Sequence, residues 1–193
     1  MKRIAVYCGS STGHDPTYKR AAVALGHALV ERGIGLVFGG GRVGLMGVIA
    51  DAVLAKGGDV RGVIPKALAT KELAHTGVTE LVVVKSMHER KAMMADLADG
   101  FIAMPGGFGT LDETYEMMTW AQLGFHRKPV GFLNVDGYFD SLVAFAERAV
   151  RDGFVSADHG AMAQVARTPE ELLALMDRYV APASPKWIGP SET

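Results

Sequence analysis

The strongest candidates for a reactive site lie in residues 101–120, which read F-I-A-M-P-G-G-F-G-T-L-D-E-T-Y-E-M-M-T-W. The apolar residues at the start predict a short buried strand, and the glycines that follow predict a turn. Thr110 and Glu113 have the spacing of a capping box, so we expect a helix with Thr110 as its N-cap. A glycine turn that leads into a helix can hold an anion, because the first backbone N–H groups are unpaired and carry a partial positive charge.

Two carboxylates, Asp112 and Glu113, follow directly on this predicted anion site. A carboxylate beside a bound anion is unfavourable by itself. These side chains therefore either cap the helix or act on another part of the ligand. The simpler alternative is that Glu113 only completes the capping box, and local pattern leaves both alternatives open.

A second group of candidate residues lies in the run S-M-H-E-R-K at residues 86–91. Ser86 and Glu89 again form a capping-box pattern, which predicts a helix that continues to about residue 97. Arg90 and Lys91 then lie in its first turns, where cations oppose the helix dipole. We interpret them as partners of an anion at the same edge of the sheet, since a guanidinium suits phosphate. The alternative is a solvated helix face.

A second glycine run, G-G-G-R-V-G at residues 39–44, formally matches the dinucleotide-binding fingerprint. The acidic residue that would bind the ribose about 20 residues later is missing, because Ile64 and Pro65 end the next strand. No glycine run continues as G-K-[ST], so a P-loop is absent as well. Two glycine-rich helix starts without that acid indicate a mononucleotide or sugar phosphate, with Gly40 and Gly41 as candidate binding residues.

Short apolar runs alternate with helical patterns along the chain. We expect strands at residues 4–8, 36–38, 60–64, 81–84, 101–104, 130–135 and 163–166, and helices at 18–32, 44–56, 86–97, 111–123, 138–151 and 168–179. Continuously apolar strands between helices are typical of a parallel sheet that is covered on both faces. The predicted fold class is therefore α/β, a Rossmann-like, doubly wound, mostly parallel sheet. It forms one domain over residues 1–180, followed by a loose tail at 181–193.

In such a sheet the loops after the first, second and fifth strands share the carboxyl edge, where ligands bind. The glycine runs and the S-M-H-E-R-K run are therefore expected to meet there, although they are far apart in the sequence.

The composition excludes several classes of protein. The 193 residues carry a formal net charge of −1, which argues against binding to nucleic acid or a membrane surface through bulk charge. The single cysteine, Cys8, excludes an intrachain disulfide, and no Cys/His spacing predicts a metal site. No apolar stretch has the length of a membrane span, and residues 4–8 are too short for a signal-peptide core. We expect a cytoplasmic protein.

At residues 105–113 the run P-G-G-F-G-T-L-D-E resembles the P-G-G-x-G-T-x-x-E signature of the lonely guy (LOG) family of cytokinin-activating phosphoribohydrolases. The S-M-H-E-R-K run is similar to the second signature of that family, and residues 39–47, 120–124 and 133–138 also resemble its members. The likeness extends over about residues 4–180. It implies hydrolysis of the N-glycosidic bond of a nucleoside 5′-monophosphate, either AMP or an N6-modified adenine nucleotide, to free base and ribose 5-phosphate.

The resemblance also implies roles for individual residues, with Arg90 and Glu113 as the catalytic pair. Besides Gly40 and Gly41, the residues expected to bind the nucleotide are Glu72, Arg90, Lys91, Gly106, Gly107, Phe108, Gly109, Thr110, Leu111, Asp112 and Thr119. Asp112 is glutamate in many relatives, which shortens one side chain but keeps its charge. A homodimer is implied as well, and neither a cofactor nor a metal is expected.

These roles agree with the chemistry of glycosidic cleavage. Positive charge grows at the anomeric carbon in an oxocarbenium-like transition state. A fixed carboxylate such as Glu113 can stabilise that charge and activate the attacking water.

Three alternatives to a phosphoribohydrolase remain. Relatives are sometimes labelled lysine decarboxylases, but that reaction normally needs pyridoxal phosphate on a catalytic lysine, and no such motif is evident. A non-catalytic nucleotide or cofactor carrier could use the same fold, yet it would not need the carboxylate of Glu113. A dehydrogenase is disfavoured by the missing ribose-binding acid.

Overall fold

The computed structural model describes residues 1–69 and 73–183. Its elements are, in chain order, β1 (Arg3–Tyr7), α1 (Pro16–Glu31), β2 (Gly35–Phe38), α2 (Gly44–Ala55), β3 (Val60–Pro65), α3 (Lys66–Leu68), β4 (Glu80–Val84), α4 (Met87–Leu97), β5 (Gly100–Ala103), α5 (Phe108–Leu123), β6 (Val130–Leu133), the 3₁₀ helix η2 (Val135–Gly137), α6 (Asp140–Arg151), α7 (Ala157–Gly160), β7 (Ala163–Ala166) and α8 (Pro169–Asp177).

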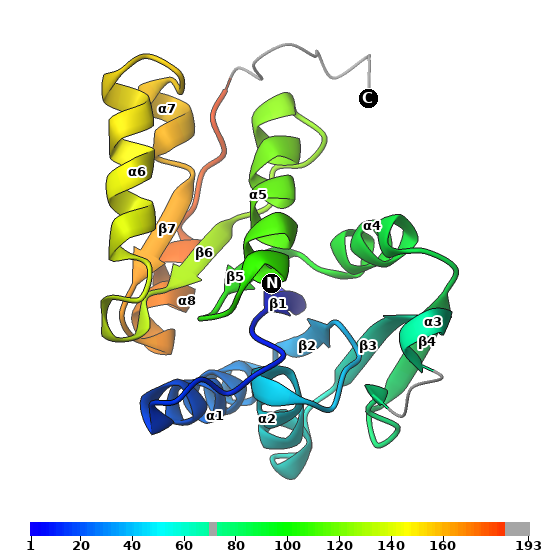
Figure 1. Cartoon of the computed structure of the whole chain (residues 1–193). Coiled ribbons are helices and arrows are strands. Elements are labelled where there is room, and N and C mark those ends of the chain that lie inside the picture. The colour runs from blue at the N-terminus through cyan, green and yellow to red at the C-terminus, as the bar shows by residue number, and fades with distance from the viewer. Residues whose placement is uncertain (70–72, 184–193) are drawn as a thin grey trace.

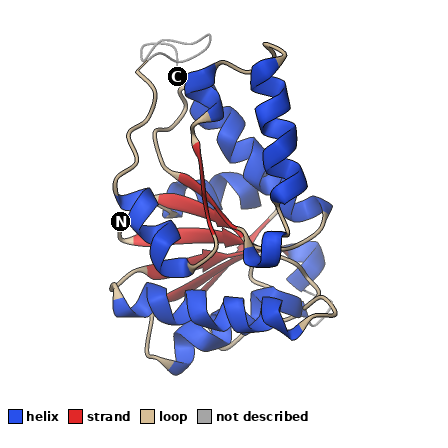
Figure 2. Cartoon of the chain, turned by 90° about the vertical axis from the view of Figure 1, so that its left-hand side faces the viewer, coloured by secondary structure: helices blue, strands red, loops and turns tan. Residues whose placement is uncertain are grey.

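The strands of the described part form one seven-stranded sheet in the order β4-β3-β2-β1-β5-β6-β7. Every neighbouring pair runs parallel, so all the strands end at the same edge. Figures 1 and 2 show helices on both faces of this sheet. The predicted α/β class, a doubly wound parallel sheet, is confirmed. The strand order reverses between β1 and β5, and in open sheets of this kind ligands bind at the edge beside such a reversal.

Alternate side chains of β1 enter two different layers of the core. Ile4 and Val6 pack with α1, α2 and α8 on one face of the sheet, in a cluster that also contains Leu25, Ile49 and Leu172. Ala5 and Tyr7 face the opposite layer, where the α4 residue Met94 and the α5 residue Met117 are fully buried. Because α4 follows β4 and α5 follows β5 in a parallel sheet, both helices also begin at the same edge of the sheet.

Local sequence explains most of the element boundaries. The Asp15 side chain accepts a hydrogen bond from the Thr17 N–H, and Pro16 occupies the first turn of α1, as its N-cap pattern predicts.

Some elements differ from the predicted ones. β6 ends at Leu133, two residues before the predicted end, and the turn that follows places Asp136 at φ 51°. Helix α7 and the 3₁₀ helix had no counterpart among the predicted elements. Most of the predicted tail, residues 184–193, lies outside the described residues.

The loops at the carboxyl edge are tied to one another by backbone hydrogen bonds. The Gly9 N–H, just after β1, donates to the Pro105 carbonyl after β5 at 3.1 Å. The Leu45 N–H at the start of α2 donates to the Gly9 carbonyl at 3.0 Å. The three glycine-containing loops therefore meet at one edge, as predicted.

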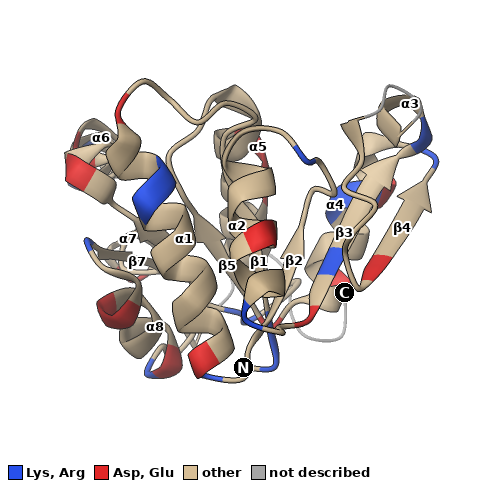
Figure 3. Ribbon diagram, turned by 90° about the horizontal axis from the view of Figure 1, so that it is seen from below, with Lys and Arg blue, Asp and Glu red and all other residues tan. Residues whose placement is uncertain are grey.

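Charged residues of both signs occur throughout the described part of the chain. In the view of Figure 3, Lys and Arg are interspersed with Asp and Glu around the molecule. Within the described residues, no helix is both long enough and apolar enough to cross a membrane.

Candidate active site

Helix α5 begins earlier than its capping-box pattern predicts. Its N-cap is Gly107, and no side chain accepts a hydrogen bond from its first turn. The prediction that Thr110 is the N-cap is therefore wrong. Glycines on both sides of Phe108 allow the helix to start there, and Thr110 lies buried inside the first turn. The helix start is left with backbone N–H groups that no side chain caps.

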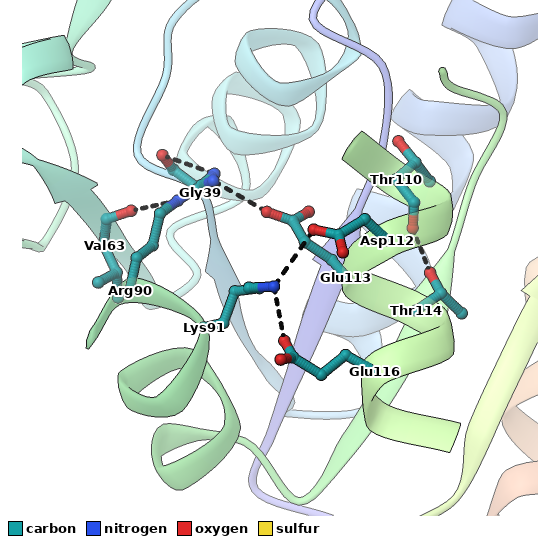
Figure 4. A network of polar contacts seen from close by, with 9 residues as sticks. All are labelled: Gly39, Val63, Arg90, Lys91, Thr110, Asp112, Glu113, Thr114 and Glu116. Atoms are coloured by element: carbon teal, nitrogen blue, oxygen red, sulfur yellow. Dashed lines mark hydrogen bonds and ion pairs between the residues drawn. The ribbon is translucent and has the colours of Figure 1, made fainter. Parts of the chain in front are cut away.

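Glu113 points from α5 to Arg90 of α4, as Figure 4 shows. The Arg90 Nη1 lies 2.8 Å from the Glu113 Oε1, and both side chains are about nine-tenths buried, with exposed fractions of 10% and 11%. The remaining guanidinium nitrogens donate to main-chain carbonyls, Nε to Val63 at 3.1 Å and Nη2 to Gly39 at 3.3 Å. Glu113 is therefore engaged by a cation and does not complete a capping box.

Burial and charge act in opposite directions on Glu113. Loss of solvent raises the pKa of this carboxyl above its ordinary value, although the Arg90 guanidinium acts to lower it. Asp112 and Glu116 raise the pKa further, and Lys91 opposes them. A carboxyl in such surroundings exchanges protons closer to neutral pH than an exposed one does.

Lys91 lies beside this pair and is held by two carboxylates of α5. Its Nζ is 3.2 Å from the Asp112 Oδ2 and 2.9 Å from the Glu116 Oε2, and the lysine side chain is only 11% exposed. Burial acts to lower the pKa of Lys91, but hydrogen bonds to Glu116 and Asp112 outweigh it and leave the pKa above its ordinary value. The alternative that Arg90 and Lys91 belong to a solvated helix face is wrong.

Helix α4, in contrast to α5, is capped as its sequence predicts. The Ser86 Oγ accepts a hydrogen bond from the Glu89 N–H at 3.1 Å, and the Glu89 carboxylate accepts one from the Lys85 N–H at 2.7 Å. The first turn of α4 is therefore occupied by side chains of its own chain segment.

The glycine loop before α5 is packed tightly on its inner side. A Cβ at Gly106 would lie 2.2 Å from the Thr110 Oγ1 and 2.7 Å from the Gly9 nitrogen, so only glycine fits there. The Tyr138 hydroxyl donates to the Gly106 carbonyl at 2.6 Å. The outer side is open, since a Cβ at Gly107 or Gly109 would meet nothing within 4 Å.

The other predicted site residues are more dispersed. Phe108 projects outward and is 93% exposed, whereas Leu111 packs toward Phe132 and away from the Arg90–Glu113 pair. Thr119 lies farther along α5, exposed, with its hydroxyl donating to the Tyr115 carbonyl.

Gly40 and Gly41 follow β2 and contact the segment after α3. The Gly40 carbonyl accepts from the His75 N–H, and Gly41 forms an isolated antiparallel bridge with Ala74. Glu72 lies outside the described residues.

Sequence reasoning missed several groups that surround the pair. The Val63 and Gly39 carbonyls are main-chain atoms, which no side-chain pattern could reveal. Glu116 could have been found, because it is four residues from Asp112 and shares its helix face. The buried hydroxyl of Tyr7 makes no hydrogen bond among the described residues. The sequence pattern predicted only that Tyr7 lies in an apolar strand and did not indicate that its hydroxyl is near the pair.

Across the described part of the chain, no group of three or more His, Cys, Asp or Glu side chains could hold a metal ion. The expectation that no metal is needed stays a prediction.

Fold and site together define a doubly wound α/β protein in which an uncapped helix start lies beside a buried arginine–glutamate pair. The family model that is described as a possible lysine decarboxylase matches residues 46–176. The chain is 51% identical over 180 residues to the cytokinin riboside 5′-monophosphate phosphoribohydrolase LOG2 of Arabidopsis thaliana, which covers 93% of this chain and 84% of that protein. Identity to the phosphoribohydrolase LOG of Oryza sativa subsp. japonica is 52% over 180 residues, 93% and 74% of the two chains. The chain belongs to this LOG family.

Solved structures with the same fold are more distant in sequence. A molybdenum cofactor binding protein from Rippkaea orientalis has a TM-score of 0.70 at 23% identity, over 91% of this chain and 95% of that one. The molybdenum cofactor carrier protein of Chlamydomonas reinhardtii has a TM-score of 0.69 at 19% identity, over 92% and 96%. At this identity the likeness shows the fold alone.

Proposed function

We propose that this protein hydrolyses the N-glycosidic bond of adenosine 5′-monophosphates, including N6-modified ones, and releases the free base and ribose 5-phosphate. The observation that carries this proposal is the buried Arg90–Glu113 ion pair at the sheet edge. Further support comes from relatives that are named cytokinin riboside 5′-monophosphate phosphoribohydrolases, because their sequences are 51% and 52% identical to this chain. The reaction is assigned to one domain over residues 1–180.

Glu113 is the residue assigned to the reacting carbon. Water adds to the anomeric carbon while the bond to the base breaks, and the electron pair of that bond leaves with the base, which gains a proton. Glu113 stabilises the positive charge that develops on the sugar and accepts the proton of the attacking water. Arg90 supports this role because its guanidinium fixes the direction of the carboxylate and partly offsets the rise in its pKa that burial causes.

The start of α5 is assigned to the 5′-phosphate. Its N-cap is a glycine, no side chain caps it, and Gly107 and Gly109 have open space on their outer side. Backbone N–H groups in such a place bind phosphate through hydrogen bonds and through the positive end of the helix dipole. Binding energy gained at the phosphate then aligns the sugar with Glu113. Lys91 adds positive charge beside Asp112 and Glu116.

A lysine decarboxylase, the activity in the description of the matching family model, is disfavoured by the state of Lys91. A lysine that forms a Schiff base must present a neutral amine. The pKa of Lys91 lies above its ordinary value because hydrogen bonds to two carboxylates outweigh its burial. Lys91 therefore serves as a cation and not as a nucleophile.

The alternative function is that of a non-catalytic carrier, which would bind the nucleotide without cleaving it. Proteins described as carriers share the fold at 19–23% identity. A carrier would not need a carboxylate at its binding site, and the buried Glu113 lies beside the helix start that is assigned to the phosphate.

We also propose a homodimer and a cytoplasmic location. Helix α6 has no buried residue although it is strongly amphipathic, and Phe145 on it is 64% exposed. An apolar groove of about 430 Å³ lies beside it, lined by residues that include Tyr115 and Phe132. Uncovered apolar surface of this kind is common at protein interfaces, which supports the dimer. Phe145→Glu is expected to yield a monomer in light scattering, and a wild-type protein that is already monomeric would contradict the dimer.

The function is tested by incubating the purified protein with AMP and with isopentenyladenosine 5′-monophosphate, followed by chromatography of the products. We expect free base and ribose 5-phosphate, and the rate ratio ranks the two substrates. The matching riboside without a 5′-phosphate serves as the control and should be cleaved much more slowly. Nucleotide that is bound but never cleaved would support the carrier instead.

A further inference from the structure

Arg90 lies in a slot between the ends of β2 and β3. Its Nε and Nη2 donate to the carbonyls of Val63 and Gly39, and its Nη1 reaches Glu113 (Figure 4). Three contacts in different directions fix the plane of the guanidinium. The direction in which Arg90 meets Glu113 is therefore set by the main chain at the two strand ends.

The missing side chain of Gly39 forms one wall of this slot. A Cβ at Gly39 would lie 1.7 Å from the Arg90 Nη2 and 2.9 Å from its Cζ, whereas the next nearest atom, the Met46 Sδ, would be at an ordinary 3.4 Å. The steric conflict is thus with Arg90 alone.

Backbone conformation does not explain the glycine at this position. Gly40, its neighbour, has φ +72°, which strains any residue with a side chain, but Gly39 lies outside that left-handed range. Gly39 is therefore glycine because of the space that the guanidinium occupies.

We infer that Gly39 is a positioning residue that acts through Arg90: its carbonyl holds the Arg90 Nη2, and its lack of a Cβ admits the guanidinium to the place from which it meets Glu113. This role rests on the proposed function only in so far as Arg90 serves the cleavage of the nucleotide. The steric coupling between the two residues is a property of the fold itself.

A methyl group at residue 39 must displace the guanidinium. The Arg90–Glu113 ion pair is then lost or misdirected, and a misplacement of about 1 Å at a catalytic group lowers turnover on the order of 100-fold. The start of α5 is not touched by this change. We therefore expect Gly39→Ala to lower kcat about 100-fold and to change KM much less.

The coupling is tested with a double-mutant cycle of wild type, Gly39→Ala, Arg90→Ala and the double variant. We expect Gly39→Ala to lower kcat and the midpoint of urea unfolding in the wild-type background. In the Arg90→Ala background, where the slot is empty, it should change neither. Equal losses in both backgrounds would overturn the inference, because Gly39 would then act independently of Arg90.

The matched control is Gly77→Ala, at an exposed turn where a Cβ would meet no atom closer than 3.4 Å. It should leave kcat and the unfolding midpoint unchanged. If Gly39→Ala does not fold, the double variant decides: recovery of folding when Arg90 is removed supports the inference, and a double variant that does not fold although Arg90→Ala alone folds contradicts it.

The unfolding cycle also separates this inference from the proposed function. It is repeated in a Glu113→Gln background, so that removal of Arg90 leaves no uncompensated buried carboxylate. If wild type cleaves no nucleotide, the proposed function fails. Non-additive unfolding midpoints would still establish that Gly39 makes room for Arg90, and additive ones would refute it.

Discussion

The starts of helices α4 and α5 lie at the same edge of the sheet and carry the same type of sequence pattern, yet they differ in structure. At α4, Ser86 accepts the Glu89 N–H, and Glu89 in turn accepts the Lys85 N–H. At α5, Thr110 and Glu113 have the same spacing, but the N-cap is Gly107 and no side chain caps the helix.

The difference shows which partner a glutamate takes when it lies three residues after a serine or threonine. Glu113 has a buried cation, Arg90, at 2.8 Å, whereas Glu89 is exposed and turns back to the main chain. Glycines before α5 also let the helix begin earlier, so Thr110 lies beyond the capping position. The start of α4 is thus capped by its own side chains, whereas the start of α5 has uncapped backbone N–H groups that can bind an anion.

The largest expected effect is that of Glu113→Gln. Loss of the carboxylate should lower kcat by about 10²- to 10⁴-fold, because general base and electrostatic assistance are both removed. The helix should remain folded, since Glu113 caps nothing. Turnover and circular dichroism are compared with Glu31→Gln, an exposed glutamate at the end of α1 that should behave as wild type. Loss of folding in Glu113→Gln would mean that the carboxylate serves mainly the stability of the fold, through its ion pair with Arg90.

Arg90→Ala should have the next largest effect. It leaves Glu113 buried without its cation, so the pKa of that carboxyl rises further and turnover falls about 100-fold or more. Because the reaction needs the ionised carboxylate, the residual activity should be lost on acidification at a higher pH than in wild type. A pH–rate profile checks this, with the exposed Arg20→Ala as the control. A wild-type rate would remove Arg90 from the mechanism.

A smaller effect is expected from charge at the open helix start. Gly109→Asp places a carboxylate beside the proposed phosphate position, where space is free. It should weaken the affinity for ribose 5-phosphate about tenfold, or about 1.4 kcal/mol, while the neutral Gly109→Asn should weaken it much less. Isothermal titration calorimetry measures both. Equal affinities for the two variants would mean that the phosphate binds elsewhere.

The smallest effect concerns the capped helix. Ser86→Ala removes the N-cap of α4 and should lower the free energy of unfolding by about 1 kcal/mol. Urea denaturation measures this loss. The affinity for ribose 5-phosphate should stay at the wild-type value, because the start of α4 is not assigned to the ligand. A large loss of phosphate affinity would contradict the contrast between the two helices.

The sequence was sufficient for most of the fold, because the signals are local. Apolar runs bounded by turn residues predicted the strands, and the last of them, β7, has the predicted bounds. The position of a strand in the sheet is not a local property. Residues 81–84 were predicted as a continuously apolar strand, but β4 lies at the edge of the sheet, where Val83 is 53% exposed.

The site was less predictable than the fold, since it depends on contacts between distant residues. Arg90 and Glu113 are 23 residues apart, and only the family resemblance suggested that they act together. The partners of Arg90 at Gly39 and Val63 are carbonyl oxygens, which every residue carries. Which carboxylate caps and which binds a cation depends on the packing of α4 against α5, and a spacing rule does not contain that information.

The most direct test is a crystal structure of the Glu113→Gln variant with bound AMP, since this variant should bind the nucleotide without cleaving it. We predict that the 5′-phosphate accepts hydrogen bonds from backbone N–H groups at the start of α5, around Gly109, and that the anomeric carbon faces residue 113. A phosphate bound at the start of α2 or α4, or a sugar turned away from residue 113, would contradict the assignment of this site.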